Sequence, residues 1–337
     1  MVRLKDIAER AGVTVMTVSK VMHNAPDISV ATKARVRALA EAMGYVPNAM
    51  ARSLRSRTTK ALGVVIPATT NPIFSRILVA LEQRAHEAGY DLYLAHSLNL
   101  VEREELVIRR LLSRYVDGLL VTPVYRLSPT APIYDDLARR GVKMVLLGHR
   151  APFCNQFANV ETADFEASKA LTKHLLDLGH RRIAFFAGPA ISPSNVERLE
   201  GYRAALRDAD LEADDRLVFN AGSTIEEGEK AAAQLMQESA RPTALQAVND
   251  LVAIGAANHF LDHGWRIPDD ISVAGFGNVL VSEYFRVPLT TVRQPKLRLG
   301  LAAMDLMLKA LAGEAAQTVR LPAELVLRQS TAALKAR

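Results

Sequence analysis

Residues 4–22, LKDIAERAGVTVMTVSKVM, decide how the N-terminal part of the chain folds. Apolar side chains recur there at i, i+3, i+4 and i+7, as on one face of a short helix: Leu4, Ile7, Ala8 and Ala11. Gly12 can adopt a positive φ and end that helix, and Thr14 suits the N-cap of a second one. The second helix would bury Val18, Val21 and Met22. Two short helices joined by a tight glycine turn are typical of a helix-turn-helix, whose second helix enters the DNA major groove.

The exposed face of the second helix is the predicted DNA-reading surface. On a helical wheel Met16 and Lys20 point away from the buried stripe, with Thr17 and Ser19 beside them. Val15 lies nearer the buried edge, so the wheel leaves its exposure open. With the cap included, the predicted major-groove contacts are Thr14, Val15, Met16, Thr17, Ser19 and Lys20. The alternative is a small helical hairpin that binds no nucleic acid.

The distribution of charge supports the prediction that this segment binds DNA. The chain has a net charge of +6, and residues 1–60 contain 11 Lys/Arg against 4 Asp/Glu. The remaining residues contain 31 basic and 32 acidic side chains, so they are close to neutral. Positive charge confined to a short segment is typical of a module that binds phosphates.

Length and composition limit the class of protein. The 337 residues suit two or three domains, and the hydrophobic content of 49% indicates a globular chain with a full core. The single cysteine, Cys154, excludes an internal disulfide framework and a cysteine metal cluster. The N-terminus lacks the apolar core of a signal peptide, and no apolar run is long enough to span a membrane. We therefore expect a cytoplasmic protein with no cofactor, no metal and no membrane partner.

A third helix and a short basic segment complete the predicted DNA-binding part. Ser29 can cap a helix whose apolar stripe is Val36, Leu39, Ala40 and Met43, and Gly44 and Pro47 end it. The helix-turn-helix domain is therefore predicted at 1–47. Residues 48–60 follow as a hinge helix and linker, with Asn48 as a candidate N-cap. This helix is too short and too polar to form alone, but its arginines around an exposed leucine suit insertion into a minor groove. A plain linker is the alternative.

From residue 61 the pattern changes to alternating strands and helices. The expected strands are 62–66, 91–95, 118–121 and 144–147, then, in a second series that begins near Val160, 183–187, 217–220, 244–248 and 272–275. The expected helices between them run near 77–88, 102–113, 133–140, 195–208, 225–237 and 251–263. One further helix, after Val160, is expected to end at residue 178. Repeated βα units predict an α/β fold of parallel sheets covered by helices on both faces. Two series in succession predict two similar lobes with a cleft between them.

Four segments carry a specific resemblance: LKDIAERAGV, TVSKV, GYVPN and ARSL, in this order and spacing. They resemble the lactose-repressor (LacI-type) family of bacterial transcription regulators, and the resemblance continues to about Ser330. It implies a homodimer that binds a palindromic DNA operator and carries a small-molecule sensor. By this resemblance Val15, Met16 and Lys20 read bases. Position 20 is commonly arginine in the family, so the operator preference is expected to differ.

The resemblance also assigns the hinge and the division of the sensor. In the hinge Leu54 matches a wedge between base pairs, and the implied minor-groove set is Asn48, Arg52, Leu54 and Arg55. The sensor at 61–337 resembles periplasmic binding proteins, and the resemblance implies that it binds the ligand and forms the dimer. The first lobe is expected at about 61–160 and 289–321, and the second at about 161–288 and 322–337, with 324–328 pairing in the second. No leucine heptads follow Ser330, which favours a dimer over a tetramer.

Ligands of open α/β sheets bind beyond the carboxyl ends of the strands, so the loops after the strands should form the site. By resemblance the ligand-binding residues are Phe74, His149, Ser192, Ser194, Arg198, Asn249, Asp250 and Gly277. This chain departs from the family at positions that often carry acids, where it has Gly148, Thr162-Ala163 and Gly277. Fewer carboxylates around Arg198 predict a sugar acid as the effector, with a neutral sugar as the second candidate.

The sequence therefore predicts a ligand-responsive, DNA-binding transcriptional regulator, a repressor in its simplest form. An activator or a corepressor-dependent repressor has the same pattern. A solute-binding sensor without a DNA role would lack the basic N-terminal segment. An enzyme is disfavoured, because no GxGxxG or P-loop follows the first strand and no catalytic constellation is evident. Salt-dependent binding to duplex DNA that requires residues 1–60 would discriminate among these classes.

Overall fold

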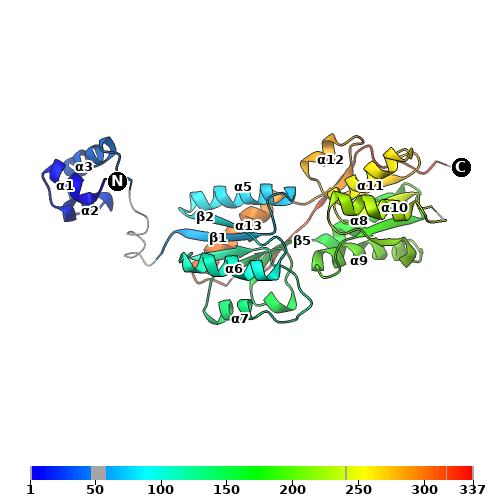
Figure 1. Cartoon of the computed structure of the whole chain (residues 1–337), viewed down its shortest axis with the longest axis horizontal. Helices are drawn as coiled ribbons and strands as arrows, with labels where there is room; N and C mark the ends of the chain where they lie inside the picture. Colours follow the sequence, from blue (N-terminus) through cyan, green and yellow to red (C-terminus); the bar gives the residue numbers. More distant parts are fainter. Residues whose placement is uncertain (1, 47–57, 240, 316, 336–337) are drawn as a thin grey trace. The chain divides into compact units, whose positions relative to one another are not determined.

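The computed structural model describes residues 2–46, 58–239, 241–315 and 317–335. The chain forms two compact units, Met1–Thr59 and Lys60–Arg337 (Figure 1). The expected hinge contacts Asn48, Arg52, Leu54 and Arg55 lie outside the described residues.

Among its described residues the first unit contains three helices, as the sequence predicts. Its helices are α1 (Leu4–Ala11), α2 (Val15–Met22) and α3 (Val30–Ala42). Gly12 ends α1 with φ +64°, and the Thr14 hydroxyl caps α2 by accepting a hydrogen bond from the Thr17 amide at 3.1 Å. One small core joins the helices, built from Ile7, Ala8, Ala11, Val18, Val21, Val36 and Ala40. The glycine turn and the Thr14 cap therefore set where α1 ends and α2 begins.

The second unit contains two six-stranded sheets. The first sheet has the order β11 (Val319–Leu321), β5 (Ala158–Thr162), β4 (Met144–Leu147), β3 (Gly118–Val121), β1 (Ala61–Ile66) and β2 (Asp91–His96). The second has the order β12 (Glu324–Val326), β10 (Thr290–Arg293), β9 (Ser272–Gly277), β8 (Ala244–Ala247), β6 (Ile183–Ala187) and β7 (Val218–Asn220). All neighbouring strands are parallel except β10 and β12, which pair antiparallel. The parallel sheets predicted from the βα repeats are thus confirmed, apart from this edge.

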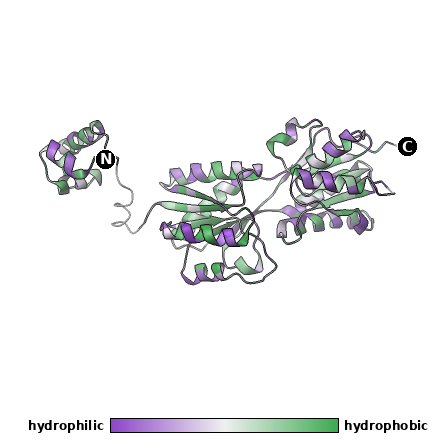
Figure 2. Cartoon of the chain, in the orientation of Figure 1, coloured by the Kyte–Doolittle hydropathy of each residue, from purple (hydrophilic) through white to green (hydrophobic). Residues whose placement is uncertain are grey.

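Helices cover both faces of each sheet (Figure 1). On the first sheet α5 (Pro72–Glu87) and α13 (Lys296–Leu311) pack on one face, and α6 (Val101–Ser113) and α7 (Pro132–Arg139) on the other. On the second sheet α8 (Asp164–Asp177) and α9 (Pro193–Asp208) oppose α10 (Ile225–Leu235) and α11 (Asp250–Asp262). Figure 2 shows apolar residues concentrated on the strands and on the inner sides of these helices. The short elements are η1 (Pro152–Cys154), η2 (Asp215–Leu217) and α12 (Leu280–Tyr284).

A glycine allows α8 and α9 to approach closely. A Cβ added to Gly201 on α9 would lie 2.3 Å from the carbonyl oxygen of Phe165 on α8, closer than real Cβ contacts. Asp164 lies in the first turn of α8, and Arg198 lies in the second turn of α9. The close approach therefore sets the separation of these two side chains.

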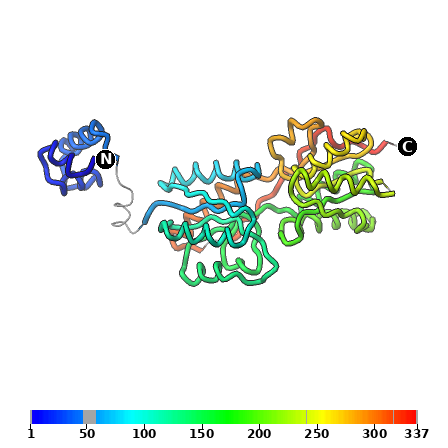
Figure 3. The backbone as a smooth tube through the Cα atoms, viewed as in Figure 1, coloured from blue at the N-terminus to red at the C-terminus, as the bar shows by residue number. Residues whose placement is uncertain are grey.

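The chain passes three times between the lobes, after β5, after β10 and between β11 and β12 (Figure 3). One predicted boundary is wrong, and another lies two residues from its expected position. The segment from 289 was expected in the first lobe, but Thr290–Arg293 pairs with β9 and β12, and Val292 is buried in the second lobe. The first lobe also extends to Thr162, because β5 pairs with β4 along its length. The crossings therefore lie at 162–164, 293–296 and 321–324.

Candidate functional sites

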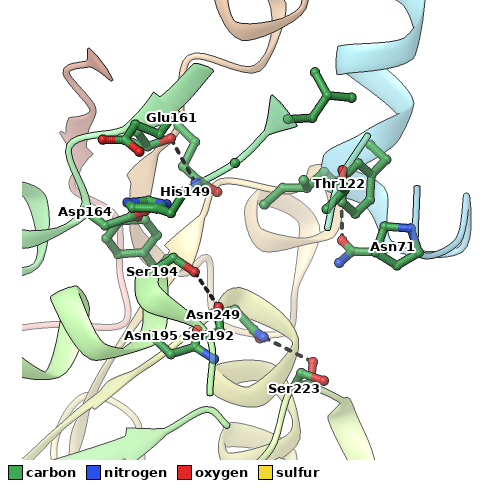
Figure 4. A pocket seen from close by; sticks show the side chains of 18 of the residues that line it. Asn71, Thr122, His149, Glu161, Asp164, Ser192, Ser194, Asn195, Ser223 and Asn249 are labelled. Atoms are coloured by element: carbon green, nitrogen blue, oxygen red, sulfur yellow. Dashed lines mark hydrogen bonds and ion pairs between the residues drawn. The ribbon is translucent and has the colours of Figure 1, made fainter. Parts of the chain in front are cut away.

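A cavity of about 450 Å³ lies between the two lobes, beyond the carboxyl ends of the strands. Polar side chains from both lobes gather around it (Figure 4). Seven predicted ligand-binding residues line it: Phe74, His149, Ser192, Ser194, Arg198, Asn249 and Asp250. Gly277 is not among the lining residues. The structure therefore brings together residues spread over nearly 180 positions of the sequence.

Arg198 is already paired within the cavity wall. Its Nε and Nη2 donate to Asp164 Oδ1 at 3.0 and 2.9 Å, and its Nη1 donates to the carbonyl of Val248 at 2.7 Å. The guanidinium also lies 3.9 Å from the ring centroid of Phe276. Burial raises the pKa of Asp164, although Arg198 opposes the rise. Arg198 therefore has a carboxylate partner before any ligand arrives.

Sequence reasoning missed Asp164. The resemblance places an acid at Thr162-Ala163, where this chain has none, but Asp164 follows directly after Ala163. An acidic residue in the first turn of a helix that follows a buried strand was the available signal.

His149 connects the lobes at the edge of the cavity. Its Nε2 lies 3.4 Å from Glu197 Oε2 and 3.6 Å from Asp164 Oδ2, both in the second lobe. Burial disfavours the charged imidazolium, but the carboxylates of Glu197, Asp164 and Glu161 outweigh it and raise the pKa of His149. Burial likewise opposes ionisation of Glu197, but His149 and Arg320 lower its pKa. These groups form a charged contact between the lobes.

The same contact contains a second cation. Arg320, on β11, donates from Nη2 to Glu197 Oε2 at 2.6 Å and from Nη1 to Glu161 Oε1 at 3.3 Å. The ligand atoms of His149, Asp164 and Glu197 lie within 4.8 Å of one another, a spacing that a metal ion could occupy. Two arginines already bind these carboxylates, and the raised pKa of His149 favours a proton on the ring. The cluster is therefore an interlobe ion-pair network rather than a metal site.

Asn249 and Asp250 are engaged by the protein itself. Asn249 Oδ1 accepts from the Val252 amide at 2.8 Å as the N-cap of α11. Asp250 is fully buried, and its Oδ2 accepts from the Val279 amide at 2.8 Å and from Ser282 Oγ at 2.7 Å. Thr291 donates to its other oxygen. Asp250 therefore holds α12 and β10 in place, which limits what it can offer a ligand.

Lys296 is a second residue that the sequence did not reveal. It begins α13 in the first lobe and lines the cavity, and its ammonium donates to the carbonyls of Gly277 and Asn278 in the second lobe. Burial lowers the pKa of Lys296 to about 8. The ammonium lies beside Gly277, where an acid was expected in relatives, and only the fold brings the two positions together.

Several buried polar atoms of the cavity have no hydrogen-bond partner. Among the described residues the buried side-chain atoms without one are His96 Nε2, Thr122 Oγ1, His149 Nε2 and Gln294 Oε1. Thr122 and Gln294 line the cavity, as does His149, whose Nε2 already lies in the ion-pair contact with Glu197 and Asp164. Buried polar groups in native proteins nearly always have a partner, and leaving one unmade costs about 1–3 kcal/mol. The cavity is therefore prepared to hydrogen-bond a polar ligand.

The second candidate site is the exposed face of α2. Met16 is 70% exposed and Val15 is 44% exposed, which resolves the ambiguity at position 15, and Val18 is buried. The Thr14 and Thr17 hydroxyls lie 2.9 Å apart at the start of the helix. Lys20 forms an ion pair with Asp27, in the loop after α2, which the sequence analysis did not predict. Across the described part of the chain, no helix is both long and apolar enough to cross a membrane.

Comparison with known proteins covers both units. Residues 3–48 match the model of bacterial regulatory proteins of the lacI family, and residues 172–331 match a periplasmic binding protein-like domain. The HTH-type transcriptional repressor PurR of Vibrio atlanticus is 33% identical over 309 residues, which make up 92% of each protein.

Two of the similar solved structures cover both units of the chain. The lac repressor dimer bound to operator and the anti-inducer ONPF has a TM-score of 0.88 and 29% identity, covering 98% of this chain and 99% of that one. The complex of the transcriptional regulator CelR with cellobiose has a TM-score of 0.74 and 28% identity, covering 98% and 100%.

Proposed function

Because this chain belongs to the lacI family of bacterial regulatory proteins and is a DNA-binding transcriptional repressor, we propose that a small polyhydroxylated effector in the interlobe cavity controls its binding to a palindromic operator. The chain acts as a homodimer in this proposal, with one α2 in each operator half-site. Catalysis is not part of it, and two of the relatives named above, PurR and the lac repressor, are repressors.

The observation that carries the effector proposal is the set of unpartnered polar atoms. Thr122 and Gln294 present acceptors, and Thr122 also presents a hydroxyl donor, to the same cavity. The Ser192 and Ser194 hydroxyls lie 2.9 Å apart on the opposite lobe. Phe74 adds an apolar face. Hydroxyl donors and acceptors around an apolar surface match the alternating polar and apolar edges of a sugar.

The charges of the cavity favour a neutral ligand over an acid. The expectation of a sugar acid assumed that Arg198 lacked a carboxylate partner, but Asp164 occupies its Nε and Nη2. Glu161 and Asp250 add two further acids to the lining. A ligand carboxylate would meet these groups at close range, where like charges repel. The cellobiose bound by the related CelR is a neutral sugar.

A sugar acid is the second candidate, and Lys296 favours it. Its ammonium is the cation of the lining that has no carboxylate hydrogen-bonded to it among the described contacts. An acid oriented toward α13 would meet this group rather than Arg198.

The dimer proposal rests on exposed apolar side chains at one edge of the first sheet. β2 is an edge strand, and Tyr93, Leu94, Leu98 and Leu100, on it and just after it, are exposed. In the second lobe α12 exposes Leu280, Val281 and Tyr284. An apolar sheet edge is a ready site for association with another chain. The related lac repressor was solved as a dimer.

The test measures effector binding and DNA binding on one protein. Duplexes selected from a random-sequence pool supply the operator, and calorimetry against pairs of each sugar and its acid supplies the effector. We expect the neutral member to bind more tightly, and to change the affinity for the selected duplex. Thr122→Val keeps the shape but removes the unpartnered hydroxyl, so it should weaken effector binding, whereas the exposed control Thr130→Val should not. The effector proposal would be contradicted if no sugar or sugar acid in the set bound to the protein.

A further inference from the structure

Lys20, at the end of α2, is held by a carboxylate. Its ammonium donates to Asp27 Oδ2, and both side chains are about half-exposed. Asp27 is one of only four acidic residues among the first 60, which carry 11 basic ones. Asp27 thus reduces the positive charge of the surface at the residue proposed to read bases.

The loop that carries Asp27 is fixed rather than loosely attached. The Ala25 amide donates to the Lys20 carbonyl at 3.0 Å. Arg37, on α3, donates to Asn24 Oδ1 at 3.0 Å. Ile28, next to Asp27, packs against the core of the three-helix unit. The carboxylate is therefore held at one place relative to α2.

The charge of Asp27 is also defined. The hydrogen bond from Lys20 lowers the pKa of Asp27, against a smaller effect of burial. Asp27 is therefore ionised at neutral pH and can only accept hydrogen bonds. A negative charge at a DNA-facing surface weakens binding to every phosphate backbone. Asp27 therefore cannot raise overall affinity, but it can contribute to selectivity between sequences.

We propose that Lys20 and Asp27 act together as a directional reader of one G·C pair in the major groove, with Asp27 as a specificity-determining residue. A guanine presents the acceptors O6 and N7, and its cytosine presents the N4 donor beside O6. Lys20 would donate to guanine while Asp27 accepts from N4 of the paired cytosine. The adjacent positive and negative groups of the ion pair thus match the adjacent acceptor and donor of the base pair. This inference rests on the proposed base-reading role of Lys20.

The pairing explains which base pairs are rejected. A C·G or A·T pair presents donor and acceptor in the opposite order, so Lys20 faces a donor and Asp27 an acceptor. A T·A pair keeps the order of O4 and N6 but lacks N7 and adds a methyl group on the Lys20 side. A lysine alone would read only the guanine side. Asp27 therefore adds discrimination through the complementary base.

The test is selection of duplexes from a random-sequence pool by the full chain, with the wild type, Asp27→Ala and Asp27→Asn compared. The control is Glu41→Gln, which removes an exposed acid on α3. We expect Asp27→Ala to lose about tenfold of the preference for G·C over C·G at one position of each half-site. Asp27→Asn, which keeps an acceptor oxygen, should lose less. Affinity for non-selected duplexes should rise in both variants, because a negative charge has been removed.

Two results would overturn the inference. If Asp27→Ala raised the affinity for all duplexes equally, Asp27 would only repel phosphates. Glu41→Gln is expected to behave in that way. Unchanged base preferences at every position would remove Asp27 from recognition. In both cases the wild type would still select a sequence, so the proposed operator recognition would stand. A wild type that selects no sequence would contradict both proposals.

Discussion

His149 Nε2 in the first lobe lies 3.4 Å from Glu197 Oε2 in the second lobe, at the edge of the interlobe cavity. Arg320 binds the same carboxylate oxygen from β11. One side chain of the second lobe is thus contacted by two cations of the first, and His149 itself lines the cavity. A ligand that contacts His149 therefore acts on a group that joins the lobes.

The first prediction is a pH dependence of stability that His149 carries. Its pKa is raised in the folded protein, so the contribution is complete below the ordinary pKa and is lost as the pH rises through the raised value. The pKa of Glu197 is lowered, so its part is lost only at acidic pH. We expect the difference in Tm between the wild type and His149→Gln to shrink as the pH rises from about 6 to about 9. A difference that grows over this range would contradict the assignment.

The second prediction compares a buried and an exposed Arg–Asp pair. Asp164→Asn leaves the guanidinium of Arg198 buried without a charged partner, which should cost about 3–5 kcal/mol in the free energy of unfolding. Asp305→Asn breaks the pair with Arg84, whose side chains are 52% and 36% exposed, and should have a small effect. Urea denaturation of both variants gives the comparison. Equal losses would mean that burial does not set the strength of the Arg198–Asp164 pair.

The third prediction concerns base readout by α2. Lys20→Ala should cost roughly 1–3 kcal/mol on the selected operator and relax the preference at one base pair of each half-site. Lys33→Ala removes a charge that has no proposed base contact, and should weaken binding evenly across sequences. Titration of each variant against a panel of operator substitutions makes the distinction. Lys20 would be excluded from the reading surface if its loss lowered affinity for every duplex equally.

The fourth prediction concerns the edge of the first sheet. Leu94 lies on the edge strand β2 and is exposed. A charge there would be desolvated in a dimer but hydrated in a monomer, so Leu94→Lys should shift the protein toward the monomer without lowering the stability of its fold. Sedimentation velocity at several concentrations measures the shift, and Leu127→Lys, at an exposed position outside β2, is the control. A dimer unaffected by Leu94→Lys would place the interface elsewhere.

The order of elements could be predicted from the sequence because it depends on local patterns. The stripe from Leu4 to Ala11 and the buried run Leu62–Ile66 each report one helix or strand through their periodicity. The lobe boundary at Thr290 could not be predicted in this way. An apolar strand has the same pattern in either sheet, and only pairing with β9 decides to which sheet it belongs.

The cavity was predicted in outline because strand ends are visible in the sequence. What each residue does there was less predictable, since it depends on partners far along the chain. Arg198 was expected to be available for a ligand, but Asp164, 34 positions earlier, binds it. Lys296 and Gly277 lie on different lobes, so their hydrogen bond can be recognised only in the folded structure. Gly277 itself does not line the cavity, although its carbonyl accepts a hydrogen bond from Lys296, which does.

The three crossings between the lobes have a consequence for synthesis of the chain. β11 forms one edge of the first sheet, and α13 covers helix α5 of the same lobe. Both β11 and α13 follow nearly the whole second lobe in sequence. A ribosome therefore releases α5 and β5 long before α13 and β11 exist, and the face of α5 that packs on α13 lacks that partner until α13 emerges. Partly made chains of this kind are prone to association and proteolysis. Neither lobe is one continuous piece of sequence, so no single excised segment isolates either half of the sensor.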